Sequence, residues 1–194
     1  MAVEFEIKFR ATPEQLTALR EAFSQEATTI VMQTTYFDTP DGKLSARKYT
    51  LRQRMENGLC VCTLKTPAGI LGRGEFEVQQ PRIEMAIEEL CKLSGIRELP
   101  YLVKDGLIPV CGARFTRIAK TLILPGCTLE LALDQGVLTG GGKEIPLCEV
   151  EAELKTGSRE AVAAFALSLA KQYGLQPEMK SKFRRALALA KGEN

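Results

Sequence analysis

The chain has 194 residues, which suits one domain of ordinary size and is too short for two full hydrophobic cores. Apolar residues make up 45% of the sequence and charged residues 26%, as in globular proteins, and the formal net charge of +2 argues against binding nucleic acid through bulk positive charge. We therefore expect a single folded domain over residues 1–194.

The complete absence of histidine excludes several kinds of site. Ser-His-Asp and Cys-His nucleophile systems, histidine acid/base catalysis and histidine-ligated metal centres all need an imidazole. The six cysteines contain no C-x-x-C pair, so we interpret them as small buried hydrophobic residues. No apolar run approaches the roughly 20 residues of a membrane helix. The N-terminus lacks the apolar stretch of a secretory signal, so we expect a cytoplasmic protein with no membrane partner.

The predicted elements begin with a strand and a helix. Residues 3–9 alternate apolar and charged side chains, which is the period of a strand with one buried face. The Thr-Pro-Glu sequence that follows is typical of a helix start and predicts a helix over about 13–25. A β-prone run over 29–36 then leads into a turn at 38–42.

Most of the middle of the chain is predicted to be sheet. Alternation returns in six segments separated by Gly, Pro and Asn turn signals, which indicates consecutive hairpins. The six segments are 50–54, 59–65, 74–79, 114–124, 127–134 and 147–155. Apolar residues at helical spacing predict further helices over 83–93, 158–173 and 181–191.

Like charges recur two or four residues apart on one face of these strands. The acids that share a face are Glu4 with Glu6, Glu75 with Glu77, Glu130 with Asp134, and Glu149 with Glu151 and Glu153. Arg52 and Arg54 form a basic pair of the same kind. For one strand the simplest interpretation is a face exposed to water. Because like charges at this spacing repel, their repetition favours a sheet closed with its charged faces inward, around ligands of opposite charge.

The chemistry of these side chains indicates which ligands they could hold. Carboxylates without histidine or thiolate partners select hard cations, so Mg²⁺ or Mn²⁺ is expected. The basic side chains would bind a polyanion.

Motifs along nearly the whole chain resemble those of the CYTH superfamily, the triphosphate tunnel metalloenzymes. Residues 4–8 resemble its E-x-E-x-K signature, 36–41 its D-T-P-D turn, 51–54 its L-R-x-R strand, 63–65 its T-x-K strand, 75–77 its second acidic pair, 131–136 its L-D-x-G strand end, 149–153 its E-x-E-x-E strand and 181–185 its S-K-x-x-R motif. Within the superfamily the chain most resembles the bacterial inorganic triphosphatases. The resemblance implies an α+β fold, with flanking helices around an eight-stranded antiparallel closed β-barrel that forms the triphosphate tunnel.

The resemblance also implies a role for individual residues. The expected phosphate ligands are Lys8, Arg52, Arg54, Lys65, Arg117, Lys182 and Arg185. The expected metal ligands are Glu4, Glu6, Asp134, Glu149, Glu151 and Glu153. Glu75, Glu77, Glu130 and Glu153 are nearby acids that could bind metal through water, and Glu75 and Glu77 could equally orient the basic side chains. The segment 114–120 lacks the usual K-x-R spacing, so Arg114 and Lys120 stay as alternatives to Arg117.

The implied activity is hydrolysis of a triphosphate, a small-molecule substrate, with Mg²⁺ or Mn²⁺ as cofactor. Conversion of inorganic tripolyphosphate to pyrophosphate and phosphate is the expected reaction. The first alternative is a thiamine triphosphatase, followed by a class IV-type adenylate cyclase or a polyphosphate-binding module without catalysis. Glu4, Glu6 and Lys8 are the expected catalytic residues. Without histidine, Lys8 or one of the carboxylates Glu4, Glu6 and Glu151 has to accept the proton.

Overall fold

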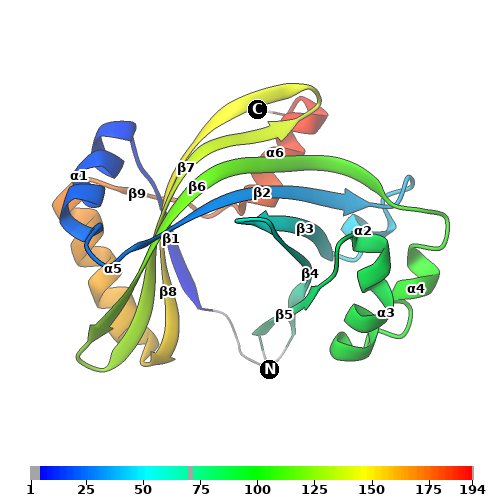
Figure 1. Ribbon diagram of the computed structural model, residues 1–194, viewed down its shortest axis with the longest axis horizontal. Helices are drawn as coiled ribbons and strands as arrows, with labels where there is room; N and C mark the ends of the chain where they lie inside the picture. Colours follow the sequence, from blue (N-terminus) through cyan, green and yellow to red (C-terminus); the bar gives the residue numbers. More distant parts are fainter. Residues whose placement is uncertain (1–4, 70–71, 194) are drawn as a thin grey trace.

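The computed structural model describes residues 5–69 and 72–193, and it consists of a strongly curved antiparallel sheet with helices packed against it (Figure 1). The elements are, in chain order, β1 (Glu6–Arg10), α1 (Pro13–Phe23), β2 (Thr28–Asp38), α2 (Lys43–Ala46), β3 (Thr50–Glu56), β4 (Leu59–Gly69), β5 (Gly72–Gln79), α3 (Ile83–Ser94), α4 (Leu99–Leu102), β6 (Ile108–Leu124), β7 (Cys127–Gly140), β8 (Lys143–Gly157), α5 (Arg159–Tyr173), β9 (Gln176–Pro177) and α6 (Lys182–Lys191).

The strands join in the order β5-β4-β3-β2-β6-β7-β8-β1-β9, and neighbouring strands pair antiparallel. The α+β class, the antiparallel sheet and the flanking helices are confirmed. The prediction of an eight-stranded closed barrel is wrong, because the sheet has nine strands and its ends are not joined by hydrogen bonds within residues 5–69 and 72–193. The outer edge of β1, which would have to meet β5, is partly occupied by the two-residue strand β9. The sheet therefore curves into an open arch (Figure 1).

The helices begin and end with recognisable capping residues. Thr12 is the N-cap of α1 and Pro13 lies in its first turn, as the sequence predicts, and Thr12 also forms a capping box with Gln15. Ser181 accepts a hydrogen bond from the backbone N–H of Arg184 and so determines where α6 begins. None of the helices in the described part of the chain has the length and apolar character that a membrane crossing requires.

The D-T-P-D turn has a local structural role. Asp38 is 5% exposed, and its carboxylate accepts hydrogen bonds from the backbone N–H groups of Thr39, Leu44 and Ser45. The side chain therefore ties the end of β2 to the short helix α2 and satisfies N–H groups at the start of that helix. The motif shapes the connection into β3, where Arg52 and Arg54 lie.

The two faces of the sheet have different partners. The apolar side chains of β1, β7 and β8 pack against α1 and α5, and those of β3 to β5 pack against α3 and α4. A third cluster joins β2, β6 and β7 to α6 through Tyr36, Phe115 and Ala186. Because strand side chains alternate, burying the outer face under the first two clusters presents the charged residues to the concave side, where Tyr36 and Phe115 of the third cluster also lie. The predicted orientation of the strand faces is thus observed.

The cysteines are free thiols in the folded protein. Burial raises the pKa of Cys62 and of Cys111 to about 12, from a reference value of 9.0. These thiols ionise first in the unfolded chain, so their stabilisation is fully present below pH 9 and is lost as the pH rises from 9 toward 12.

We predict that the free energy of unfolding decreases by about 1 kcal/mol per buried thiol between pH 8 and pH 10. Urea titrations at the two pH values measure the loss. Cys62→Ala, which removes one of the thiols, should show a smaller decrease over this interval. An equal decrease in the variant and the wild type would contradict the attribution of this pH dependence to the buried thiols.

Candidate functional site

The concave side of the sheet encloses a charged cavity of about 330 Å³. Each of the strands β1 to β8 contributes at least one side chain to it, and so does the start of α6. The charged residues that line it are Glu6, Lys8, Arg52, Arg54, Glu56, Lys65, Glu75, Glu77, Arg117, Glu130, Glu151, Glu153, Lys155 and Lys182. Glu6 and Lys182, which are 176 positions apart in the sequence, therefore meet in one enclosed space.

Strands β3, β4 and β5 form one wall, in which basic and acidic side chains alternate. Arg52 Nη2 donates to Glu75 Oε1 at 3.1 Å and to Glu77 Oε1 at 3.3 Å. Lys65 Nζ lies 2.8 Å from Glu75 Oε2. Thr63, which faces Glu77 across the strands, donates its hydroxyl to that carboxylate at 2.9 Å. The acids of β5 therefore orient the cations of β3 and β4 toward the cavity.

Arg54 is the cation of this wall whose positive charge is least offset by neighbouring carboxylates. It pairs with Glu56 on its own strand and lies 3.9 Å from Glu77. Its Nε is buried and has no hydrogen-bond partner among the described residues. Burial and the neighbouring Arg52 lower the pKa of Arg54 from its ordinary value. Both observations indicate a guanidinium that an anionic ligand would stabilise.

Arg117 is the main cation of the opposite wall. Its Nε and Nη2 donate to the two oxygens of Asp134, both at 2.8 Å, and Nη2 also donates to Glu151 at 2.5 Å. Glu130 lies 3.9 Å from its Nη1. Burial lowers the pKa of Arg117, but the surrounding carboxylates outweigh this and raise the pKa well above its ordinary value. This wall therefore has a surplus of negative charge, in contrast to the surroundings of Arg54.

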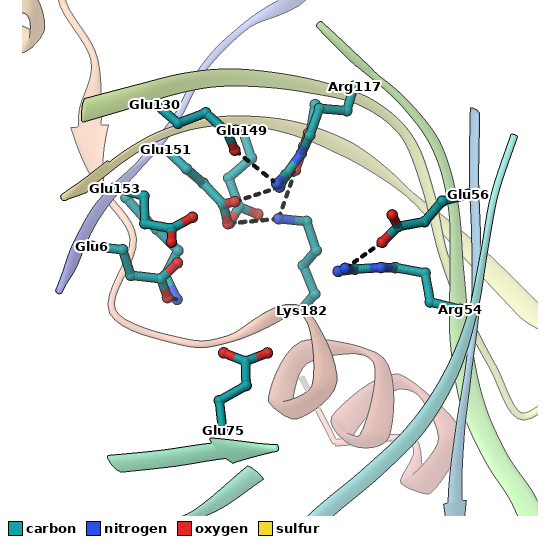
Figure 2. A network of polar contacts seen from close by, with 12 residues as sticks. Glu6, Arg54, Glu56, Glu75, Arg117, Glu130, Glu149, Glu151, Glu153 and Lys182 are labelled. Carbon is teal, nitrogen blue, oxygen red and sulfur yellow. Dashed lines mark hydrogen bonds and ion pairs between the residues drawn. The ribbon is translucent and has the colours of Figure 1, made fainter. Parts of the chain in front are cut away.

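Lys182 reaches from the first turn of α6 into the same group of carboxylates (Figure 2). Its ammonium lies 2.8 Å from Asp134 Oδ2, 3.2 Å from Glu149 Oε1 and 2.8 Å from Glu151 Oε1. Burial lowers the pKa of Lys182, and the three carboxylates more than reverse that effect and raise it. Burial raises the pKa of Glu151 in turn, but Lys182 and Arg117 prevail and hold that pKa well below the usual value.

Pairs of acids face each other across β1, β7 and β8. Glu6 lies opposite Glu153 in the strand register, and Glu153 lies opposite Glu130. Lys8 lies 3.1 Å from Glu6, and Lys155 lies 2.9 Å from Glu153. Like charges directly opposite each other destabilise a sheet. Paired acids of this kind could hold a further cation beside Lys8, Lys155 and Arg117, which already lie next to them.

The structure places the predicted site residues in two layers. The predicted residues that line the cavity are Glu6, Lys8, Arg52, Arg54, Lys65, Arg117, Glu151, Glu153 and Lys182. Asp134 and Glu149, both fully buried, and Arg185 lie behind this lining. Glu4 lies outside the described residues. Arg114 instead pairs with Glu144 at 2.5 Å and has an exposed side chain, which places Arg117 and not Arg114 in the cavity.

Sequence reasoning missed several residues of the site. Glu56 and Lys155 continue the alternation of their strands, so their position could have been inferred. The apolar side chains of Met32, Tyr36 and Phe115 also line the cavity, although their strands show no charge pattern at those positions. Glu178, a buried acid in the connection to α6, gave no signal in the sequence.

The donor set fits a hard divalent cation. Within the described ranges, no group of three or more Asp, Glu or Cys side chains could hold a metal ion by itself. Mg²⁺ ordinarily uses one or two carboxylates and completes its coordination with water and phosphate oxygens. Glu6 and Glu153 lie opposite each other on the cavity wall and could serve as such a pair of oxygen ligands.

Comparison with known proteins gives a family match over most of the chain. Residues 2–187 match the family model of the CYTH domain. The chain is 28% identical over 197 aligned positions to an inorganic triphosphatase of Haemophilus influenzae. The alignment covers 97% of this chain and 55% of that protein, so the chain spans about half the length of this curated relative.

Solved structures show the same fold. A candidate adenylyl cyclase from Hippeastrum, described as having a dominant triphosphatase activity, superimposes with a TM-score of 0.72 at 23% identity and covers 99% of this chain and 97% of its own. A candidate adenylate cyclase from Bacillus halodurans has a TM-score of 0.65 at 19% identity, with coverage of 94% and 96%. At these identities the likeness concerns the fold alone.

Proposed function

Because the chain belongs to the CYTH domain family, we propose that it is a divalent-metal-dependent triphosphatase that hydrolyses inorganic tripolyphosphate to pyrophosphate and phosphate. The observation that carries this proposal is the cavity in which basic side chains from β1, β3, β4, β6, β8 and α6 meet carboxylates from β1, β3, β5, β7 and β8. A small polyanion and a hard cation both find ligands there. The inorganic triphosphatase from Haemophilus influenzae supports the choice of reaction.

Phosphate binding would rest mainly on the wall that contains Arg52, Arg54 and Lys65. Guanidinium groups form charge-assisted, often bidentate hydrogen bonds with phosphate oxygens, and Arg54 has a buried nitrogen atom free for such a bond. Lys182 and Arg117 approach from the opposite wall and would contact the other side of the triphosphate. We therefore place the triphosphate between the two walls.

Hydrolysis requires that a water oxygen form a bond to the terminal phosphorus while the bridging P–O bond breaks and pyrophosphate leaves with the electron pair. The chain's part is to hold the phosphates in line, to offset the charge on the leaving oxygens and to accept one proton from the water. A bound Mg²⁺ or Mn²⁺ would supply further charge neutralisation at the phosphate oxygens. Glu6 and Lys8, 3.1 Å apart on the cavity wall, are the groups that we favour as proton acceptor, and Lys8 would have to be neutral to act in this way. Glu151 is a poor base, since its pKa is held low.

One observation keeps thiamine triphosphate as a second candidate substrate. Ile30, Met32, Tyr36, Phe115 and Phe183 form an apolar part of the cavity lining, and the rings of Tyr36 and Phe183 lie 5.0 Å apart. Such a surface could contact an organic base attached to the phosphates. Inorganic tripolyphosphate makes no use of it.

We predict metal-dependent phosphate release from tripolyphosphate that exceeds release from thiamine triphosphate and from ATP. Phosphate release is measured for the three substrates in parallel with Mg²⁺, with Mn²⁺, with Ca²⁺ and with excess EDTA. Ca²⁺, whose coordination is longer and looser, should support the reaction poorly. Full activity in EDTA would exclude the metal requirement. Preference for thiamine triphosphate would transfer the assignment to the second candidate.

A further inference from the structure

A second row of charges lies behind the cavity lining, where β8, the β9–α6 connection and α6 meet. Glu149 is fully buried and uses its two oxygens for different cations. Oε1 accepts from Lys182, which lines the cavity, and Oε2 pairs with Arg185, which does not. The resemblance to the family implied that Arg185 is a phosphate ligand, but its guanidinium forms ion pairs with the carboxylates of Glu149 and Glu178.

Glu178 completes this row. Its side chain is 6% exposed, and Oε2 lies 3.5 Å from Arg185 Nη1 and 3.3 Å from Arg10 Nε. Its other oxygen accepts from the backbone N–H of Lys180 at 2.8 Å. Its own N–H donates to the carbonyl oxygen of Lys8 at 2.9 Å. Glu178 is therefore fixed to the backbone of β1 before it meets Arg185.

The charges alternate along the row from Glu178 through Arg185 and Glu149 to Lys182. A buried carboxylate shared by two cations stays between them only if neither attracts it much more strongly. Glu178 offsets part of the charge of Arg185, whose Nε is buried and has no hydrogen-bond partner among the described residues. Without Glu178, Arg185 would draw Glu149 toward itself and away from Lys182, whose contact with Glu149 is already the longest of its three, at 3.2 Å.

We propose that Glu178 is a positioning residue that acts through Arg185 and Glu149 to place the ammonium of Lys182 in the cavity. The inference rests on the proposed function, since Lys182 matters here as a ligand of the triphosphate. It gives a role to an acid outside every motif of the sequence. It also changes the role of Arg185 from phosphate ligand to a link in this row.

A double-mutant cycle between Glu178 and Lys182 tests the inference. Glu178→Gln removes the charge but keeps an oxygen to accept from the N–H of Lys180. We expect this change to raise the KM for tripolyphosphate about 5-fold to 10-fold, with a smaller effect on kcat, because a ligand contact is lost in the ground state and in the transition state alike. In a Lys182→Met background, adding Glu178→Gln should change KM less than about 2-fold, since coupled residues are not additive.

Arg10→Met is the matched control. It removes the other cation held by the same Glu178 oxygen, and the Arg10 side chain is 65% exposed. KM should stay within about 2-fold of the wild type, because surface ion pairs contribute little. A purely structural role of Glu178 predicts instead that its penalty is the same with and without Lys182. That additive result would overturn the inference.

Two further measurements keep the test decisive. If Glu178→Gln does not fold, Arg185→Lys enters the same cycle, because a lysine keeps the charge but cannot span Glu149 and Glu178 together. Calorimetric titration with tripolyphosphate in EDTA yields a Kd for each variant without any turnover. A wild type that binds tripolyphosphate but releases no phosphate would refute the proposed function alone. If Glu178→Gln changes Kd by the same factor with and without Lys182, the positioning role alone would be refuted.

Discussion

Replacing Glu151 with Gln is expected to lower the kcat for tripolyphosphate hydrolysis by about 100-fold, the effect typical of removing one electrostatic group from an active site. Glu151 lines the cavity and contacts both Arg117, at 2.5 Å, and Lys182, at 2.8 Å. The amide keeps the shape of the side chain but removes the charge that orients these two cations. It is also a poorer oxygen ligand for a divalent cation.

Steady-state kinetics of the folded variant measure this effect, and Glu144→Gln is the matched control. Glu144 also pairs with an arginine at 2.5 Å, but this pair, with Arg114, is exposed and lies away from the cavity lining. The control should stay within about 2-fold of the wild type, because an exposed pair is screened by solvent. Equal rates for Glu151→Gln and the wild type would remove Glu151 from the site.

The second large effect concerns stabilisation by ligand. Tripolyphosphate and Mg²⁺ at about 100 times Kd should stabilise the wild type by roughly 2.7 kcal/mol, which raises the melting temperature by about 5–10 °C for a domain of this size. Lys65→Glu should abolish most of this shift. The side chain is 15% exposed, lines the cavity and lies 2.8 Å from Glu75, so the substitution adds a negative charge beside another one on the phosphate-binding wall.

Thermal denaturation across a tripolyphosphate titration measures the shift, with Lys43→Glu as the control. Lys43 also lies between carboxylates, 3.1 Å from Asp41 and 3.0 Å from Asp105, but outside the cavity lining. It should retain the full shift. Lys65→Gln, which adds no charge, takes the place of Lys65→Glu if the latter is unfolded. The same small shift in wild type and Lys65→Glu would mean that the basic residues of β3 and β4 do not bind the ligand.

The sequence was sufficient to predict which strand faces carry the charges. Alternation in segments such as 50–54 and 149–153 is a local property, because side chains of a strand point to opposite faces whatever the strand packs against. For the same reason the choice of Arg117 over Arg114 follows once it is known which residues of β6 face the cavity. Arg114 and Arg117 are three positions apart in this strand and so lie on opposite faces. The helix starts at Thr12 and Ser181 were also local, because capping needs only neighbouring N–H groups.

Only the tertiary structure decided how the sheet ends and which charges stand behind the cavity. The pairing of β9 with β1 joins segments more than 160 residues apart, and no periodicity within two residues could reveal it. The ion pairs of Arg185 with Glu149 and Glu178 depend in the same way on where α6 lies against β8. Motif spacing identifies a residue type at a position, but whether that residue faces a ligand or another side chain is determined by packing between distant elements. Arg185 and Glu178 show this difference, because a local pattern sets the direction of a side chain, whereas its partner is set by the fold.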